Sequence, residues 1–198
     1  MPEAVINVVT ANPAAFGTLA DDAARVAAYT AQQNLNALRT TQCVQSVAQS
    51  LTASAELALL KTTADDIASH LAIVQSNPVR GPVLTLIRDQ RTGEMFAAQN
   101  LGAVPEELHP ILQSRLEKYL MESGQNLNPR WGVPGSHSDF AALNQAMLRR
   151  EAIGLPVTTL DDFGMYNTQL WRNRLGVPVD RCGNCGVLTD GVRVFSGR

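Results

Sequence analysis

The sequence has few charged residues, few aromatic rings and few cysteines. Only 17% of its 198 residues are charged, 5% are aromatic, and three are cysteine. The 16 Lys and Arg residues nearly balance the 18 Asp and Glu residues, for a formal charge of -2. This balance excludes a generally basic surface that attracts phosphate groups. Three cysteines are too few for a disulfide scaffold. Because 45% of the residues are hydrophobic, we still expect a folded core.

Long apolar runs and a leader sequence are also missing. No apolar run approaches the roughly 20 residues that a helix needs to span a bilayer. The first residues, MPEAVINVVTANP, lack the basic segment and the long apolar stretch of a secretion signal. We therefore expect a soluble protein, or a piece of one, with no membrane partner. Its length suits one domain, or one domain with a helical extension.

Charge is distributed unevenly along the chain. Residues 1–124 carry 8 basic and 12 acidic side chains, a net charge of -4. Residues 125–198 carry 8 basic and 6 acidic side chains, a net charge of +2. The C-terminal part is therefore the better place for a negatively charged ligand.

The first third of the sequence has helical character. Residues 17–77 are rich in Ala, Gln and Leu and contain no proline. Thr63, followed by a pair of aspartates, predicts a helix start, because Thr caps helices and acidic residues suit the positive end of the helix dipole. We expect residues 1–62 to be a helical extension or a linker from a longer parent protein, and residues 63–198 to be the main domain.

Strand and helix patterns alternate in the rest of the chain. An apolar run, a turn with Gly, and a second short run predict a hairpin after Pro78. Apolar residues at helical spacing predict the helices. The expected elements are strands 83–88 and 94–98, helices 110–122, 140–151 and 162–174, a strand or turn at 157–160, and a last strand at 192–195.

Two short motifs lie at predicted junctions between a loop and a helix. His137 and Asp139 stand at the first junction, and Cys182 and Cys185 form a C-x-x-C at the second. One imidazole and two thiolates suit zinc with an open fourth position. Helix starts lower thiol pKa values and favour the thiolate. A carboxylate two residues after the histidine is suited to transfer protons beside the open position.

These motifs resemble the signature of zinc-dependent nucleobase deaminases, H-x-E followed by P-C-x-x-C. They are more closely similar to the YwqJ-like branch of bacterial toxin deaminases. There the first motif continues as a helix with an A-L-N core, as in residues 140–144. The second motif reads R-C-x-N-C and is followed by T-D-G-V, as in residues 181–185 and 189–192. The resemblance covers roughly residues 65–198.

The resemblance implies an α/β protein with the three-layer cytidine-deaminase-like fold, in which helices cover a central sheet and both motif helices lie on one face. It implies that His137, Cys182 and Cys185 bind Zn²⁺ and that Asp139 transfers protons. The implied activity is hydrolysis of a C–N bond in a nucleobase, with cytosine to uracil in single-stranded nucleic acid, DNA first, as the leading candidate. Members of the family are typically C-terminal parts of larger secreted effectors that act in the target-cell cytoplasm and are neutralised by a cognate immunity protein.

The sequence departs from the general deaminase signature at two positions. Arg181 stands before Cys182 where that signature has Pro. Asp139 stands where the proton-transferring residue is usually Glu, which is one methylene longer. A displacement of about 1 Å in a catalytic group can cost on the order of 10²-fold in rate. Three explanations of Asp139 are open: the backbone lies closer to the site and compensates for the shorter side chain, this branch of the family uses Asp, or activity is lost.

Four residues near the motifs are candidates for substrate binding: Trp131, Asn128, Ser136 and Arg181. Trp131 either stacks on a flipped base or covers the core under its loop. Asn128 either contacts a ribose or makes a turn, and the turn is favoured.

Other functions stay open. The C-x-x-C also suggests a redox pair of the thioredoxin type. Residues 186–198 are too few, however, to form the strands and helix that follow the motif in that fold. A structural zinc site needs a fourth ligand, for which His70 and His109 are candidates. Two further alternatives are a weakly active zinc-containing binding module and an enzyme that acts on a free nucleoside or another small molecule.

Overall fold

The computed structural model describes residues 52–124 and 128–197. The chain divides into two compact units, Met1–Ser54 and Ala55–Arg198, and the second is described here. Residues 52–74 are helical. The elements that follow are α2 (Asn77–Arg80), β1 (Val83–Asp89), β2 (Met95–Gln99), α3 (Pro110–Ser123), the 3-10 helix η2 (Pro129–Trp131), α4 (Ser138–Ala152), β3 (Phe163–Gln169), α5 (Gly183–Leu188) and β4 (Arg193–Val194).

The four strands form one mixed sheet in the order β2-β1-β3-β4. Strand β1 is antiparallel to both β2 and β3, and β3 is parallel to β4. Thr85 lies opposite Ala98 on one side and Asn167 on the other. The hairpin turn is closed by Asp89, whose Oδ1 accepts a hydrogen bond from the Arg91 backbone N–H at 2.8 Å.

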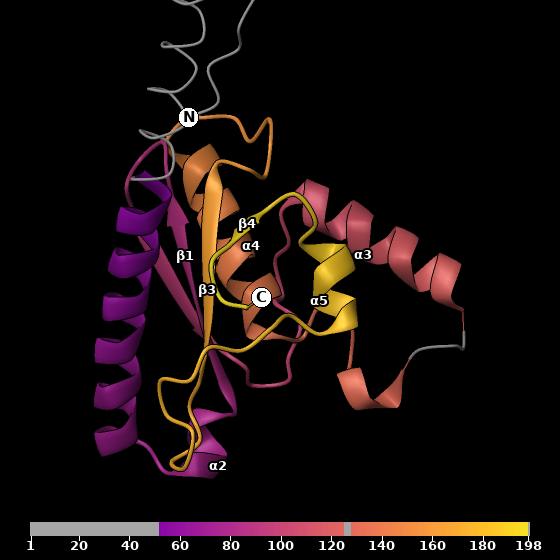
Figure 1. Ribbon diagram of the computed structural model, residues 1–198. Coiled ribbons are helices and arrows are strands. Elements are labelled where there is room, and N and C mark those ends of the chain that lie inside the picture. The colour runs from indigo at the N-terminus through magenta and orange to yellow at the C-terminus, as the bar shows by residue number, and fades with distance from the viewer. Residues whose placement is uncertain (1–51, 125–127, 198) are drawn as a thin grey trace, which may run out of the picture. The chain divides into compact units, whose positions relative to one another are not determined.

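The sheet is the middle of three layers (Figure 1). Successive side chains of a strand point to opposite faces, so β1 contributes to two cores. Leu86 packs with Leu60 of the helix over residues 52–74. Ile87 belongs to the larger core on the other face, with Phe140 of α4 and Leu188 of α5. Both motif helices therefore cover the same face, and the expected three-layer α/β fold is confirmed.

The first described helix starts earlier than predicted. It is already helical at residue 52, so Thr63 lies inside it rather than at its start. Leu60, Ala64 and Ala68 are buried at intervals of four residues. This packing against the sheet stabilises the helix, so its start does not depend on a cap at Thr63. The helix runs through residue 62. The assignment of residues 1–62 to an extension or linker stays a prediction, and residues 1–51 lie outside the described part.

The helix predicted over residues 162–174 is wrong. Residues 163–169 instead form β3, the strand between β1 and β4. Six of its seven residues are buried, so the polar-apolar alternation that identifies a half-exposed strand is missing. Its Tyr and Thr residues favour a strand, whereas its Gly and Asn residues favour neither a strand nor a helix.

The other predicted elements agree with the structure in type. The hairpin, α3 and the last strand lie within one or two residues of their predicted bounds, and α4 begins two residues before residue 140. Residues 157–160 form no regular element, as the alternative of a turn allowed. None of the described helices combines the length and apolar character that crossing a membrane requires.

Candidate metal centre

His137 is presented at the start of α4. Its backbone is extended, with φ -92° and ψ 160°, and its side chain makes no capping hydrogen bond, so the imidazole is available as a ligand. The helix start is fixed from both sides. Ser136 Oγ donates to Val133 O at 2.7 Å in the preceding loop. Thr85 Oγ1 donates to Ser138 Oγ at 2.8 Å, which ties α4 to β1.

Both thiols are presented by α5. Cys182 is the N-cap residue and Cys185 lies in the first turn. The backbone N–H of Gly186 donates to Cys182 O at 2.8 Å, and that of Thr189 donates to Cys185 O at 2.9 Å. Residues three apart on a helix lie on one side of it. The C-x-x-C spacing therefore directs both sulfur atoms toward the same point.

The structure brings His137, Cys182 and Cys185 together. His137 Nδ1 lies 3.3 Å from Sγ of each cysteine, and the three ligand atoms are all within 4.8 Å of one another. Within residues 52–124 and 128–197, this is the one group of three or more histidine, cysteine or carboxylate side chains with such spacing. One imidazole nitrogen and two sulfur atoms are the donors that zinc prefers, and three protein ligands leave a position open. The residues therefore fit Zn²⁺.

Interactions among the three ligands shift their pKa values. Interaction with the Cys185 side chain and with His137 lowers the pKa of Cys182 to about 4. Interaction with Cys182, together with burial, raises the pKa of Cys185. The hydrogen bond to Cys182 raises the pKa of His137. One thiolate is therefore already present at neutral pH, as metal binding requires.

Asp139 lies beside the three ligands without belonging to their group. It is 5% exposed, and its Oδ1 accepts a hydrogen bond from Cys185 Sγ at 3.1 Å. Burial raises the pKa of its carboxyl. Although Asp139 is one methylene shorter than Glu, its carboxylate reaches the ligand group.

The turn at η2 contacts both motifs. The Trp131 ring lies against Gly183, where an added Cβ would overlap its six-membered ring. Gly132, with φ +67°, lies so near the imidazole that a Cβ would be 3.0 Å from His137 Nε2. Trp131 itself is 38% exposed. It therefore borders the metal centre and is not enclosed in the core.

The other candidate substrate-binding residues make local hydrogen bonds. Asn128 Oδ1 accepts from the Arg130 backbone N–H at 3.0 Å, the predicted turn contact. Arg181 Nη1 donates to Thr189 Oγ1 at 2.8 Å and Thr189 O at 3.0 Å, at the end of α5. The Oγ of Ser136 bonds within its own loop. A substrate role for these residues stays a prediction.

Neither histidine proposed as a fourth ligand joins the group. His109 is buried at the start of α3, where its Nδ1 accepts from the Ile111 backbone N–H at 3.2 Å and its Nε2 lies 3.0 Å from Glu151 Oε1. His70 is exposed on the helix over residues 52–74. The described residues thus give three ligands and no closed structural site.

Sequence reasoning missed two asparagines. Asn144, in the A-L-N segment, accepts from the His109 backbone N–H and donates to Glu107 O, both at 2.8 Å, and so holds the chain before α3. Asn184 is buried between the two cysteines and bonds to the η2 turn and to α3. Its position inside R-C-x-N-C was the available signal.

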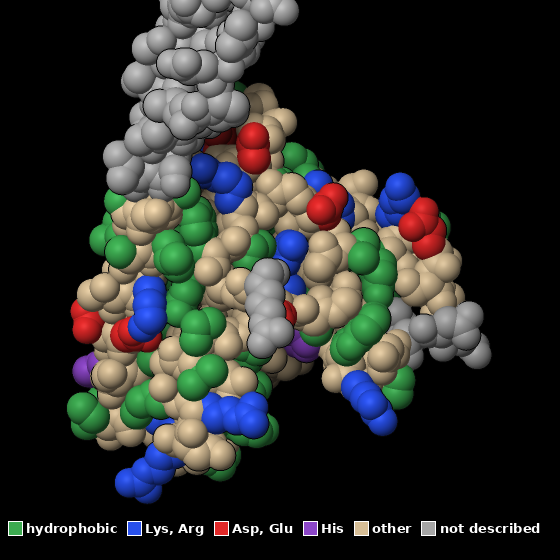
Figure 2. All heavy atoms as spheres, in the orientation of Figure 1, with side chains coloured by type: hydrophobic (Ala, Val, Ile, Leu, Met, Phe, Trp, Pro, Cys, Tyr) green, Lys and Arg blue, Asp and Glu red, His purple; other side chains and the backbone are tan. Residues whose placement is uncertain are grey.

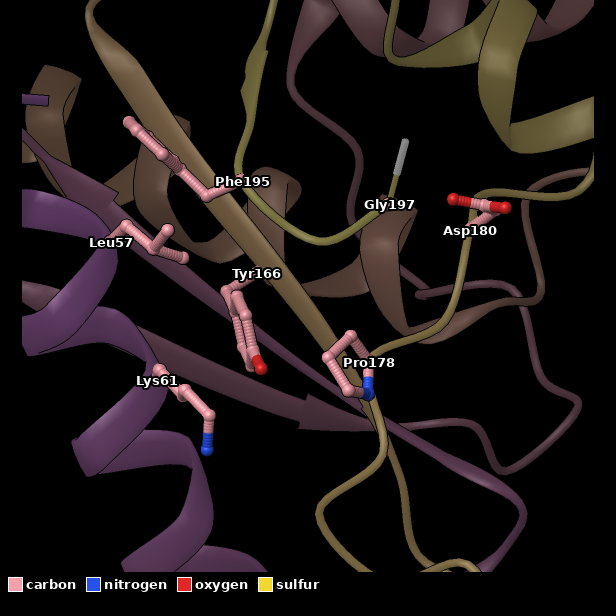
Figure 3. Close-up of a pocket in the computed structure, with 7 residues that line it drawn as sticks. All are labelled: Leu57, Lys61, Tyr166, Pro178, Asp180, Phe195 and Gly197. Carbon is pink, nitrogen blue, oxygen red and sulfur yellow. The ribbon is translucent and has the colours of Figure 1, made fainter. Parts of the chain in front are cut away.

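Two further surface features are a pocket and the distribution of Lys and Arg side chains. A pocket of about 410 Å³ lies between the helix over residues 52–74 and the end of the chain (Figure 3). Its Tyr166 packs with Leu60, on the sheet face opposite to α4. On the face shown in Figure 2, Lys and Arg side chains are scattered and form no stripe.

Comparisons with known proteins agree with this geometry. The model of the YwqJ-like deaminase family matches residues 75–194. The chain is 31% identical over 116 residues to Toxin YwqJ of Bacillus subtilis (strain 168), in an alignment that covers 56% of this chain and 18% of that protein. The chain thus spans less than a fifth of that relative's length. No solved structure shows significant similarity. The match includes the whole of the metal centre, and the chain belongs to the YwqJ-like deaminase family.

Proposed function

We propose that this chain is a zinc-dependent deaminase domain that converts cytosine to uracil in single-stranded DNA. The observation that carries the proposal is the convergence of His137, Cys182 and Cys185, with the Asp139 carboxylate 3.1 Å from Cys185 Sγ. Three ligands and an adjacent buried carboxylate are the parts that a hydrolytic zinc deaminase needs.

The reaction replaces the exocyclic amino group of cytosine with oxygen from water and releases ammonia. When bound, Zn²⁺ acts as a Lewis acid that lowers the pKa of water. Asp139 accepts the proton that this water loses and delivers it to the departing amino group.

The substrate base has to be unpaired or flipped out of a duplex. Trp131 offers a ring on which such a base can stack, because it is 38% exposed and lies on Gly183. Arg172 and Arg174 are exposed and suited to phosphates. The neighbouring arginines of α4 are engaged elsewhere, since Arg149 pairs with Glu94 and Arg150 is buried.

A free nucleoside is the second candidate substrate. The scattered cations on the face in Figure 2 favour it, because a polymer-binding groove usually carries a row of them. Affinity for a DNA strand falls steeply with salt, whereas affinity for a nucleoside does not. The salt dependence of KM therefore separates the two substrates.

We also propose that the domain is part of a delivered effector. The support is the relative, whose name is Toxin YwqJ and of which this chain spans 18%. On this proposal the domain acts in the cytoplasm of a target cell, and a cognate immunity protein neutralises it.

The test is sequencing of DNA and RNA after induced expression in a host that lacks uracil repair. We expect C-to-T changes in DNA with the natural sequence and none with His137→Ala. Because loss of a ligand can also impair folding, Asp139→Ala with measured zinc content is the second variant. Changes confined to RNA would move the substrate to RNA. No excess of any transition in either polymer, with zinc bound, would contradict the nucleic-acid substrate.

A further inference from the structure

We propose that Asn184 and Tyr119 are positioning residues that hold Trp131 at the metal centre as a fixed aromatic wall for the substrate base. This inference deepens the proposed deaminase function and rests on it for the identity of the substrate. Its structural half concerns the contacts of Trp131 and is testable without any deaminase assay.

The contacts of Asn184 use both ends of its amide. Asn184 is 1% exposed, and its Nδ2 donates to Gly132 O at 3.1 Å and to Trp131 O at 3.3 Å. Its Oδ1 accepts from the Tyr119 hydroxyl at 2.8 Å. The carbonyl oxygens of Trp131 and Gly132 can only accept hydrogen bonds, so the NH₂ group of Asn184 must face the turn. The Tyr119 hydroxyl donates to the amide oxygen. Tyr119 thus holds the oxygen end of the amide whose nitrogen end holds the Trp131 turn.

The position of Asn184 couples the turn to the metal ligands. Asn184 lies between Cys182 and Cys185 on α5, so its backbone is placed by the same helix that presents both thiols. The turn at Trp131 and Gly132 is therefore aligned to the ligands themselves. Partners of this kind orient the groups around a metal, and their loss commonly impairs affinity or activity.

Core packing does not account for this anchoring. Trp131 keeps 38% of its surface exposed and Val187, one turn beyond Gly183 on α5, keeps 55%. Figure 2 shows hydrophobic side chains on this face over α5. A ring that is anchored through its backbone yet left open to solvent is suited to contact a ligand.

The first test measures acrylamide quenching of Trp131 in the zinc-loaded full chain. Trp171→Phe removes the other tryptophan, which is 52% exposed. Tyr119→Phe and Asn184→Leu should each increase the accessibility of Trp131, since losing one hydrogen bond shifts a local equilibrium by roughly fivefold. Tyr166→Phe is the matched control, because within the described residues the Tyr166 hydroxyl has no hydrogen-bond partner. Unchanged quenching in both variants would overturn the proposal.

The second test measures kinetics on a cytosine-containing single-stranded oligonucleotide. Tyr119→Phe should raise KM by roughly fivefold, the same population shift, with little change in kcat and in zinc content. Trp131→Ala should also raise KM, and Tyr119→Phe should add nothing to it, because the two changes remove one interaction. Additive effects would overturn the positioning role. If quenching increased in both variants but the natural sequence showed no deaminase activity, the positioning of Trp131 would stand and the proposed function alone would be contradicted.

Discussion

Asp139 is the residue on which the proposed chemistry depends most. Its carboxylate lies 3.1 Å from Cys185 Sγ, so the shorter side chain reaches the ligand group. We expect Asp139→Ala to lower kcat by about 10²- to 10⁴-fold, the usual contribution of a general acid or base. Asp139→Glu should lower kcat by on the order of 10²-fold, because the added methylene displaces the carboxylate by about 1 Å. Steady-state kinetics with metal analysis of each variant checks this.

The matched control for Asp139 is Asp66→Asn, because Asp66 is exposed on the helix over residues 52–74. Zinc content should stay the same in all three variants, since Asp139 is outside the ligand group. Higher activity in Asp139→Glu would show that the natural side chain is too short. Loss of zinc in Asp139→Ala would show that the carboxylate acts on the metal site and not on protons.

Single residues differ in how far the sequence reveals them. The convergence of His137 and the two cysteines was predictable, because ligand chemistry restricts both residue type and spacing. The role of Asn184 was not predictable, since it depends on Tyr119, 65 positions away in the chain. The bonds of Arg181 within its own segment became visible only when α5 was placed.

Within α5, two glycines should respond in opposite ways to the same substitution. Gly186 has no neighbouring atom within 4 Å of an added Cβ, whereas Gly183 has the Trp131 ring. Gly186→Ala should stabilise the domain by about 0.5–1 kcal/mol, because Ala loses less entropy in a helix. Gly183→Ala should lower the Tm, because the methyl group displaces the ring. Thermal unfolding of the zinc-loaded variants tests both, and equal shifts would contradict the placement of Trp131.

Elements were predictable where the sequence carries a clear local signal, such as the turn of the hairpin or the apolar stripe of α3. The hairpin and α3 carry regular apolar patterns, and both were placed within one or two residues. Strand β3 was misassigned as helix, because six of its seven residues are buried and no polar-apolar alternation marks it as a strand. The early start of the helix over residues 52–74 depends on packing against Leu86, which is a tertiary contact.

For the molecule as a whole, α4 connects the metal centre to the opposite end of the sheet. Its first residue, Ser138, accepts from Thr85 beside the ligands. Near its other end, the fully buried Arg150 donates to Asp89 Oδ2 at 2.7 Å and to Asp162 Oδ2 at 2.9 Å. The guanidinium also lies 4.0 Å from the centre of the Phe163 ring. Helix α4 is thereby joined to β1 at two points and to the start of β3 at one.

Because of this network, the stability of the fold should fall at acid pH. Burial raises the pKa of Asp89, but hydrogen bonds from Arg150 and from the Arg91 and Thr92 backbones outweigh burial and lower the pKa below its ordinary 3.8. The ionised carboxylate therefore stabilises the fold fully above pH 3.8, and this contribution is lost as pH falls through the lower folded-state pKa.

Asp89→Asn should reduce the free energy of unfolding by about 3 kcal/mol at pH 7, because it leaves the buried Arg150 with only Asp162 as a charged partner. It should also flatten the loss of stability below pH 3.8, since an amide does not titrate there. Urea unfolding at a series of pH values measures both effects, and Asp66→Asn should leave both as in the natural sequence. If the stability curves of Asp89→Asn and the natural sequence stayed parallel on acidification, the buried pair would not be the source of the acid sensitivity. Convergence of the curves toward low pH would assign that sensitivity to the network that joins α4 to both strands.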